Sequence, residues 1–332
     1  MGETGMSGER ENGAPRVDVI VAAWNRADTI DRAVTSALAQ DGLGRVIVVD
    51  DASTDDTPAR IAELSRNEPR LVSLRFAVNR GPAAARNAAL ALASAPYVTL
   101  LDGDDFLRPG RLAGLLGFAA GQDFVADDLL QVAASELDRV EPQPMLGGSF
   151  APWALDFAAF VRGNVSRPGR NRHELGFFKP LMRRAFLVEY RLGYDESLRL
   201  GEDFDLYARA LLAGARFLVV PAQGYVSVAR PNSLSGAHGR ADLERLYARS
   251  RALDRPGLDR RERAALAAHG RSLDARIQWL RLIEAVKARD PAACLRPFLR
   301  SATVSRFLLR NLAEQLVRRG GGRLAALLGA RG

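Results

Sequence analysis

Residues 97–107 read YVTLLDGDDFL, and the rest of the sequence is organised around this stretch. Its first half is apolar and rich in β-forming residues, and it stops at three carboxylates, Asp102, Asp104 and Asp105, with only Gly103 between the first two. The pattern predicts a buried strand that ends in an acid cluster. Three neighbouring anions repel one another, so we expect a cation or a polar ligand to offset the repulsion. The alternative is a solvated turn, which Asp and Gly also favour.

The residue types in this cluster indicate which metal it would suit. Carboxylate oxygens are hard ligands for Mg²⁺ or Mn²⁺, and proteins commonly hold such ions with one or two carboxylates and the phosphates of a substrate. A single cysteine, Cys294, excludes a cysteine-cluster metal site, and with only three histidines a zinc site is not expected. The sequence therefore predicts a site for a hard divalent cation, with the turn as the remaining alternative.

Length and composition limit the class of protein. A chain of 332 residues with 47% hydrophobic content buries one large core or two modest ones. It contains no run of 18 uncharged apolar residues, so no membrane-spanning helix is expected. The polar start lacks the apolar segment of a secretory signal, and we expect residues 1–15 to be a disordered leader. The lone cysteine fits a reducing, cytoplasmic setting.

The net charge of +8 suggests an anionic partner, and most of the positive charge lies late in the chain. From Arg240 onward, Arg and Lys outnumber Asp and Glu by more than two to one. Binding of nucleic acid requires a basic face with aromatic stacking platforms or a known reader module, and this tail has few aromatics and no such signature. We therefore expect no nucleic-acid partner.

Strands and helices alternate along the first hundred residues. Apolar runs predict strands at 17–23, 45–50, 71–76 and 97–101, and helical periodicity predicts helices at 30–38, 57–67 and 83–93. This alternation predicts an α/β fold with a parallel sheet, in which ligands bind beyond the carboxyl ends of the strands. Trp24, Asp51 and the acid cluster all fall at such ends. The first strand is followed by AAWNRAD, which lacks the glycines of dinucleotide and P-loop sites.

Five motifs occur in a fixed order over roughly residues 17–215: VDVIVAAWN, VIVVDDAST, NRGPAAARNAAL, YVTLLDGDDFLRP and GEDFDLYARAL. The set resembles the family 2 glycosyltransferases, inverting nucleotide-sugar enzymes of the GT-A fold. Two later runs, GFFKPLMRRAFL and GYDESLRLGEDF, also resemble bacterial exopolysaccharide enzymes of the succinoglycan glucosyltransferase type. The resemblance implies a Rossmann-like, mostly parallel sheet with flanking helices.

The resemblance also implies how the chain is divided. A glycosyltransferase domain would span residues 16–239, with a nucleotide-binding half at 16–120 and an acceptor half at 121–239. A basic helical extension would occupy residues 240–332.

Roles in the nucleotide site follow from the same resemblance. Trp24 matches an aromatic that stacks on uracil, Asp51 matches the acceptor for uracil N3, and Arg86 matches an arginine that lines the pocket. A core position for Trp24 and a solvated helix charge for Arg86 are the alternatives. The expected nucleotide-binding set also includes Ala22 and Asn25.

The resemblance implies that the acid cluster binds the metal and the ribose. Asp102 would hold the ribose hydroxyls, and Asp104, with Asp102, would bind the Mg²⁺ or Mn²⁺ that bridges the two phosphates. Candidates for a loop over the phosphates are Lys179, Arg230 and Ser233.

The motif GEDFD at 201–205 supplies the expected catalytic base. Inverting transfer to a hydroxyl needs one general base opposite the leaving diphosphate. The resemblance implies that this base is Asp203, with Glu202 in support. The alternative is an acidic first turn that the dipole of the following helix favours, and both statements can be true of the same residues.

The implied function is metal-dependent, inverting transfer from a nucleotide sugar, most simply a UDP-sugar, to a glycan or lipid-linked acceptor in exopolysaccharide or cell-surface polysaccharide synthesis. Two rival functions stay open at this point: a sugar-nucleotide nucleotidyltransferase, and a non-catalytic module that binds nucleotide sugars or polysaccharide. The first would usually carry a phosphate loop rich in glycine and arginine after its first strand, which AAWNRAD does not resemble.

The stretch SRFLLRNLAEQLVRR at 305–319 has an apolar stripe flanked by arginines. This pattern is typical of a helix that lies on a membrane surface, and a lipid-linked acceptor would fit peripheral contact with the inner membrane. Packing on the catalytic domain or on a second subunit, as in a homodimer, is the alternative.

Overall fold

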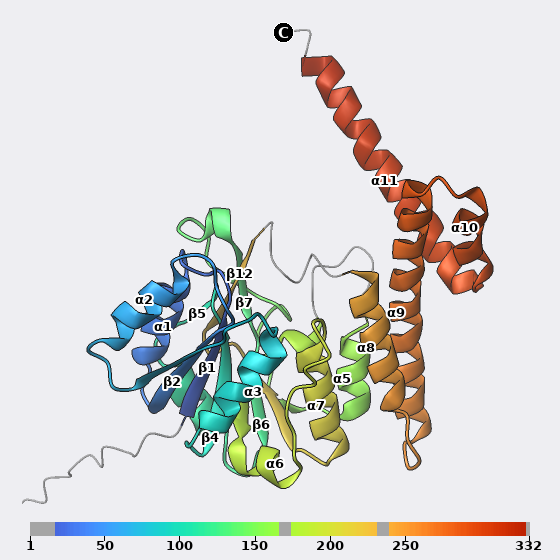
Figure 1. Cartoon of the computed structure of the whole chain (residues 1–332). Helices are drawn as coiled ribbons and strands as arrows, with labels where there is room; N and C mark the ends of the chain where they lie inside the picture. The colour runs from blue at the N-terminus through green and yellow to red at the C-terminus, as the bar shows by residue number, and fades with distance from the viewer. Residues whose placement is uncertain (1–16, 166–173, 231–238, 330–332) are drawn as a thin grey trace, which may run out of the picture. The chain divides into compact units, whose positions relative to one another are not determined.

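The computed structural model describes residues 17–165, 174–230 and 239–329, which form two compact units (Figure 1). Of these residues, 17–156, 177–196 and 209–230 belong to the first unit and the others to the second. This division differs from the expected boundary at residue 240, because α5 (Phe157–Gly163) and the first turns of α7 (Glu202–Leu212) are grouped with the C-terminal helices.

The first unit is built on an eight-stranded sheet with the order β3-β2-β1-β4-β10-β6-β11-β9. Its parallel half consists of the four predicted strands, each within two residues of its expected ends: β1 (Val17–Ala23), β2 (Leu43–Asp50), β3 (Leu71–Arg75) and β4 (Tyr97–Asp102). The mostly parallel α/β sheet predicted from the sequence is therefore confirmed. The other half mixes directions and contains β10 (Leu181–Arg183), β6 (Phe124–Asp127), β11 (Phe217–Val220) and β9 (Trp153–Ala154).

Helices cover both faces of the parallel half. In Figure 1, α3 (Pro82–Leu92) lies in front of β1 and β2, whereas α1 (Ile30–Leu38) lies behind them, and both helices contact both strands. The helix α2 (Thr57–Ser65) packs on β3. A strand covered on both faces buries every side chain, which explains the nearly continuous apolar runs of β1 and β2. Two further helices of this unit are α4 (Arg111–Gly117) and α6 (Arg184–Glu189).

A second, four-stranded sheet begins directly after the acid cluster. Its order is β5-β12-β7-β8, formed by Phe106–Leu107, Tyr225–Ala229, Leu130–Ala133 and Gln143–Pro144. Apolar side chains of β7 and β12 form its buried core. Because β5 follows Asp105 and pairs with β12, this small sheet fixes the chain that leaves the cluster.

The second unit is helical. The helix α9 (Arg260–Lys287) packs against α5, α8 (Arg240–Ala252), α10 (Pro291–Leu295) and α11 (Ala302–Gly329), which confirms the prediction of helices beyond residue 240. It begins with a capping box, in which Asp259 and Glu262 each accept a hydrogen bond from the other's backbone N–H. Short 3₁₀ turns occur at Ala134–Glu136, Leu175–Phe177 and Arg296–Leu299. Among the described residues, none of the helices combines the length and the hydrophobicity that a membrane-spanning segment requires.

Candidate functional site

The carboxyl ends of three neighbouring strands meet at one edge of the parallel sheet. In the register, Ala22 of β1 lies beside Asp102 of β4, and Ala23 lies beside Asp50 of β2. The chain runs outward from β1 to β3 and then crosses back to β4, so β1 and β4 form the topological switch point, where open α/β sheets bind their ligands. The three loops predicted to converge do so here.

Asp102 is held between two cations. One of its carboxylate oxygens pairs with Nη2 of Arg86 at 2.9 Å, and the other pairs with Nζ of Lys179 at 3.1 Å. Burial alone would raise the pKa of the Asp102 carboxyl, but Lys179 and Arg86 outweigh it and hold the pKa well below its usual range. Asp102 therefore stays an anion at any physiological pH.

Arg86 and Lys179 are both buried, from different parts of the chain. Arg86 projects from α3, and its ion pair with Asp102 shows that the alternative of a solvated helix charge is wrong. Lys179 precedes β10, and its backbone carbonyl accepts a hydrogen bond from Thr99 of β4. No local pattern indicates that Lys179 pairs with the cluster, since it lies 77 positions after Asp102 in the chain.

Asp104 has less compensation for its charge. Its carboxylate lies 3.4 Å from Nη2 of Arg26, and its backbone carbonyl accepts a hydrogen bond from Arg32. Burial raises the pKa of the Asp104 carboxyl, Arg26 opposes the rise, and neighbouring Asp102 adds to it. A further cation would relieve this repulsion, so the donor set fits a hard divalent ion at Asp104. No group of three or more His, Cys, Asp or Glu side chains that could hold a metal is found among the described residues.

Asp105 is a structural member of the cluster. Its two oxygens accept hydrogen bonds from the Tyr225 hydroxyl and from the backbone N–H of Val228, both at 2.8 Å. The same hydroxyl accepts a hydrogen bond from the backbone N–H of Asp102 at 3.1 Å. Burial, with the charges of Asp102 and Asp104, raises the pKa of Asp105 to about 8. Asp105 therefore ties the acid cluster to β12 and carries little charge at neutral pH.

Asp51 organises the loop that leads into α3. Its oxygens accept hydrogen bonds from the backbone N–H groups of Arg80 and Gly81, at 2.7 and 2.8 Å. Gly81 adopts a φ of +90°, which favours glycine at this turn. Each oxygen keeps a lone pair, so the predicted contact with a base N–H remains compatible with this arrangement. The neighbouring Asp50 accepts a hydrogen bond from the backbone of Ser53 and pairs with Arg75.

The loop after β1 is fixed against the loop after β2. Asn25, at a φ of 51°, donates its backbone N–H to Ser53 Oγ and accepts a hydrogen bond from the backbone of Thr54, both at 2.9 Å. The preceding Trp24 is 38% exposed, so the alternative of a core tryptophan is wrong. Trp24 therefore presents an exposed aromatic surface beside the strand ends.

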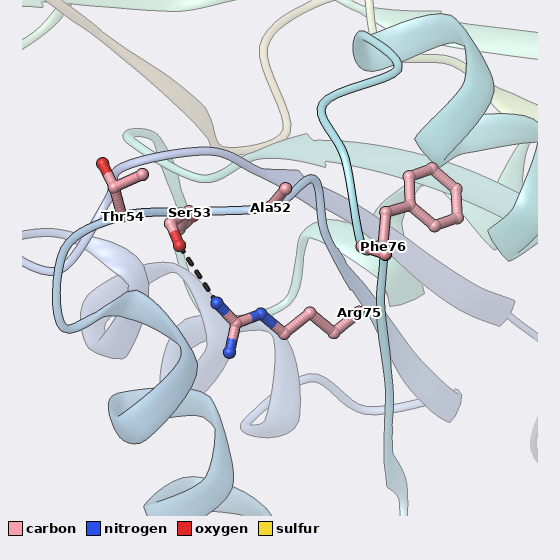
Figure 2. Close-up of a pocket in the computed structure, with 6 residues that line it drawn as sticks. Ala52, Ser53, Thr54, Arg75 and Phe76 are labelled. Atoms are coloured by element: carbon pink, nitrogen blue, oxygen red, sulfur yellow. Dashed lines mark hydrogen bonds between the residues drawn. The ribbon is translucent and has the colours of Figure 1, made fainter.

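A pocket lies at the ends of β2 and β3, beside this loop (Figure 2). Arg75 donates a hydrogen bond to the backbone carbonyl of Ser53 across it, at 3.1 Å, and the ring of Phe76 points away from this contact. Its lining consists of Ala52, Ser53, Thr54, Arg75, Phe76 and Ala77. Sequence reasoning missed Arg75 and Phe76, although their place at the end of a predicted strand was a usable signal.

Of the phosphate-loop candidates, Arg230 pairs with Asp28 at 2.6 Å, and its charge also acts on Asp104 and Arg32. Ser233 lies outside the described residues. Arg26, Arg32 and Arg230 therefore give the Asp104 end of the site a positive surround, which suits an anionic ligand.

The predicted base lies in the second unit. Glu202 and Asp203 occupy the first turn of α7, where Glu202 is half-buried and Asp203 is buried. The alternative explanation of these acids, an acidic first turn favoured by the helix dipole, requires a helix at this point, and α7 is that helix.

Comparison with known sequences matches residues 18–187 to the family described as Glycosyl transferase family 2. The chain is 48% identical over 244 residues to the succinoglycan biosynthesis protein ExoU of Rhizobium meliloti, a match that covers 71% of this chain and 69% of that protein. It is 36% identical over 319 residues to ExoO of the same organism, with 92% and 86% covered.

Two solved structures share the fold. The first 349 residues of S. aureus TarS, in complex with UDP-GlcNAc, match with a TM-score of 0.59 at 20% identity, over 84% of this chain and 89% of that one. The mannosyltransferase PcManGT from Pyrobaculum calidifontis, in complex with GDP-Man and Mn²⁺, matches with a TM-score of 0.57 at 20% identity, over 92% and 81%. At this identity the likeness concerns the fold, and it agrees with the GT-A architecture predicted from the sequence.

Proposed function

The chain belongs to glycosyl transferase family 2, and on that premise we propose that it moves a sugar from a UDP-sugar to a hydroxyl of a glycan or lipid-linked acceptor in exopolysaccharide synthesis. The observation that carries the donor half of this proposal is Asp104, a carboxylate at the switch point of the sheet whose charge is incompletely compensated. The names of the two rhizobial relatives support the polysaccharide product, and the UDP-GlcNAc complex of TarS supports the class of donor.

The nucleoside would occupy the ends of β1, β2 and β4. Trp24 stacks on the base, and Asp51 accepts the N–H of uracil, with Ala22, Asn25 and Arg86 as the remaining nucleotide-binding residues. Asp102 accepts from the ribose hydroxyls, a role suited to a carboxylate whose negative charge two buried cations maintain.

A divalent cation, Mg²⁺ or Mn²⁺, would bind at Asp104. Asp102 is the weaker of the two predicted ligands, because both of its oxygens already pair with cations. The chemistry that the ion would supply is stabilisation of the negative charge that grows on the leaving diphosphate. Arg230 and Ser233 are the proposed loop residues over the phosphates, whereas we assign Lys179 to the Asp102 carboxylate.

The transfer itself is a single displacement. The acceptor oxygen attacks the anomeric carbon, and the bond between that carbon and the diphosphate oxygen breaks, with its electron pair leaving on the diphosphate. Asp203 takes the proton of the acceptor hydroxyl, and Glu202 supports it. One displacement inverts the anomeric carbon, so an α-linked donor gives a β-linked product.

The acceptor side involves the C-terminal helices. Large apolar side chains are exposed on this part of the second unit, at Leu295, Leu299 and Leu309, among several arginines. We propose that this surface contacts anionic lipid at the inner face of the membrane, where a lipid-linked acceptor would lie. Flotation with anionic vesicles tests this: the full chain should float and a chain ending at residue 294 should not, whereas equal behaviour would favour a homodimer contact instead.

The catalytic assignment is tested with UDP-glucose, UDP-GlcNAc and GDP-mannose as donors and water as acceptor. We expect release of UDP from one of the uridine donors, with the β anomer of the sugar appearing first by NMR. Asp203→Asn should lower this rate at least 100-fold and leave UDP affinity within about twofold. Full activity of Asp203→Asn would remove Asp203 from the mechanism, and release of the α anomer would exclude a single displacement.

A further inference from the structure

The first turn of α7, which carries Asp203, is packed closely against α8. Gly201 precedes this turn at a φ of +74°, and a Cβ at Gly201 would lie 2.7 Å from a methyl carbon of Leu246 on α8. A side chain larger than hydrogen would therefore require the Leu246 side chain to shift, and the positive φ independently favours glycine. Both observations explain the glycine of the GEDFD motif.

Arg249, one turn further along α8, forms a bidentate ion pair with Asp205 in the same turn of α7. Its Nε lies 3.0 Å and its Nη2 3.2 Å from the two oxygens of Asp205, whose side chain is fully buried. A fork of this kind fixes orientation as well as charge. Because Asp205 is two residues after Asp203, the pair holds the backbone on which the proposed base sits.

Phe204, which lies between Asp203 and Asp205 in the sequence, contacts aromatic rings from two other helices. It stacks on Phe160 of α5 with centroids 5.5 Å apart, and its other neighbour is His269 of α9 at 4.4 Å. His269 shares a hydrogen bond with Ser250 of α8 at 2.9 Å. Burial, with a smaller effect of Arg276, lowers the pKa of His269 to about 4, so its ring adds no charge beside the turn at neutral pH.

We infer that Arg249 and His269 are positioning residues for Asp203, so that the C-terminal helices are part of the catalytic apparatus through the first turn of α7. The inference rests on the proposed role of Asp203 as the base. A general base works only within hydrogen-bond reach of the hydroxyl it deprotonates, and an error of about 1 Å in such placement costs on the order of 100-fold in rate. Three contacts from α5, α8 and α9 on one helical turn provide that precision.

Arg249 also adds a positive charge close to the proposed base. Other charged or titratable side chains around this turn include Glu202 and Asp205 on α7, and His269 with Arg276 on α9. Removal of Arg249 takes away a positive charge that pairs with the buried Asp205 carboxylate, two residues from Asp203. Loss of a nearby positive charge raises the pKa of a carboxyl. In the pH profile of kcat, the acid limb, where activity falls as the pH is lowered, should therefore move to higher pH.

The test uses the full chain and release of UDP from the uridine donor that it hydrolyses. Arg249→Ala should lower kcat at least tenfold, leave UDP affinity within about twofold, and move the acid limb up by about 1 pH unit. The double variant Arg249→Ala/Asp205→Asn, which removes the negative charge together with the positive charge that pairs with it, should return the limb toward its native position. Arg251→Ala, an exposed arginine on the same helix, is the matched control and should change none of these quantities.

Milder variants cover the case in which Arg249→Ala fails to fold. Arg249→Lys keeps the charge and loses the fork, and His269→Gln keeps a hydrogen-bonding group for Ser250 and loses the ring contact, so each should lower kcat with unchanged UDP binding. A kcat and an acid limb equal to those of Arg251→Ala would overturn the inference. If Asp203→Asn is inactive while the Arg249 and His269 variants are normal, only the positioning role fails. If Asp203→Asn is active, the base assignment fails with it.

Discussion

The acidic run at residues 102–105 and the acidic run at 202–205 look alike in sequence. In each run, one carboxylate has a structural role and another has a proposed role in binding or catalysis. In the first, Asp105 is buried and tied to β12 by Tyr225, whereas Asp104 carries charge that is incompletely compensated. In the second, Asp205 is buried and tied to α8 by Arg249. In both runs the last acid secures the local structure, and an earlier acid is the one that we assign to chemistry.

The acids that we assign to chemistry should differ from the structural ones in how they affect stability. A structural carboxylate has its hydrogen-bonding capacity met by fixed donors, so removing it leaves those donors unpaired. Asp104, which we assign to the metal, is held against burial and the repulsion of Asp102, so removing its charge relieves an unfavourable interaction. The two kinds of acid should therefore respond in opposite directions to the same substitution.

Stability measurements test this division with the largest effect. Asp205→Asn should lower the free energy of unfolding by about 2 kcal/mol, because it breaks a buried, charge-assisted pair. Asp104→Asn should leave the free energy of unfolding within about 0.5 kcal/mol or raise it, because it removes a repelled charge. Chemical denaturation at pH 7 measures both, and equal losses would erase the distinction between the two acids.

A second test is specific to the helical unit and concerns pH. Because the folded-state pKa of His269, about 4, lies below its ordinary value of 6.5, its contribution to stability is complete above about pH 6.5 and is lost as the pH falls toward 4. The slope approaches about 1.4 kcal/mol per pH unit between these values. The melting temperature of His269→Gln should depend less on pH over this range than that of the native chain. An equal dependence on pH would show that His269 titrates normally.

The smallest expected effect concerns the exposed aromatic of the first unit. Trp24→Ala should weaken UDP binding by roughly fivefold to tenfold, or about 1–1.4 kcal/mol, which is the lower end of the roughly 1–3 kcal/mol that stacking of an aromatic side chain on a base contributes. Its melting temperature should stay near the native value, because the side chain is exposed. Unchanged UDP affinity would remove Trp24 from the nucleotide site.

Sequence alone predicted the parallel half of the main sheet well. The strands β1, β2 and β4 are buried on both faces, and such strands must be apolar along their whole length, so their pattern is visible without knowledge of their partners. The convergence of Trp24, Asp51 and the acid cluster followed from this topology. The two-residue strands β5, β8 and β9 were not predicted, because partners far away in the chain define them.

The sequence indicated candidate residues for the site, but it did not indicate which of them form ion pairs with one another. The pattern located Asp102, Arg86 and Lys179, yet only the fold brings α3 and the segment before β10 to the same carboxylate. Likewise, nothing local to GEDFD indicates that Arg249 or His269 binds its helix. Long-range ion pairs of this type depend on tertiary packing and leave no periodic signal in the sequence.

Calorimetry of UDP binding, with and without Mn²⁺, tests the central claim most directly. The native chain and Asp203→Asn should both bind UDP, with affinity that increases when Mn²⁺ is present. Asp104→Ala should lose the Mn²⁺-dependent part of the affinity and keep its fold, as judged by the melting temperature. Equal binding by Asp104→Ala and the native chain in the presence of Mn²⁺, or no binding of UDP by the native chain in either condition, would contradict the assignment of the acid cluster as the donor site.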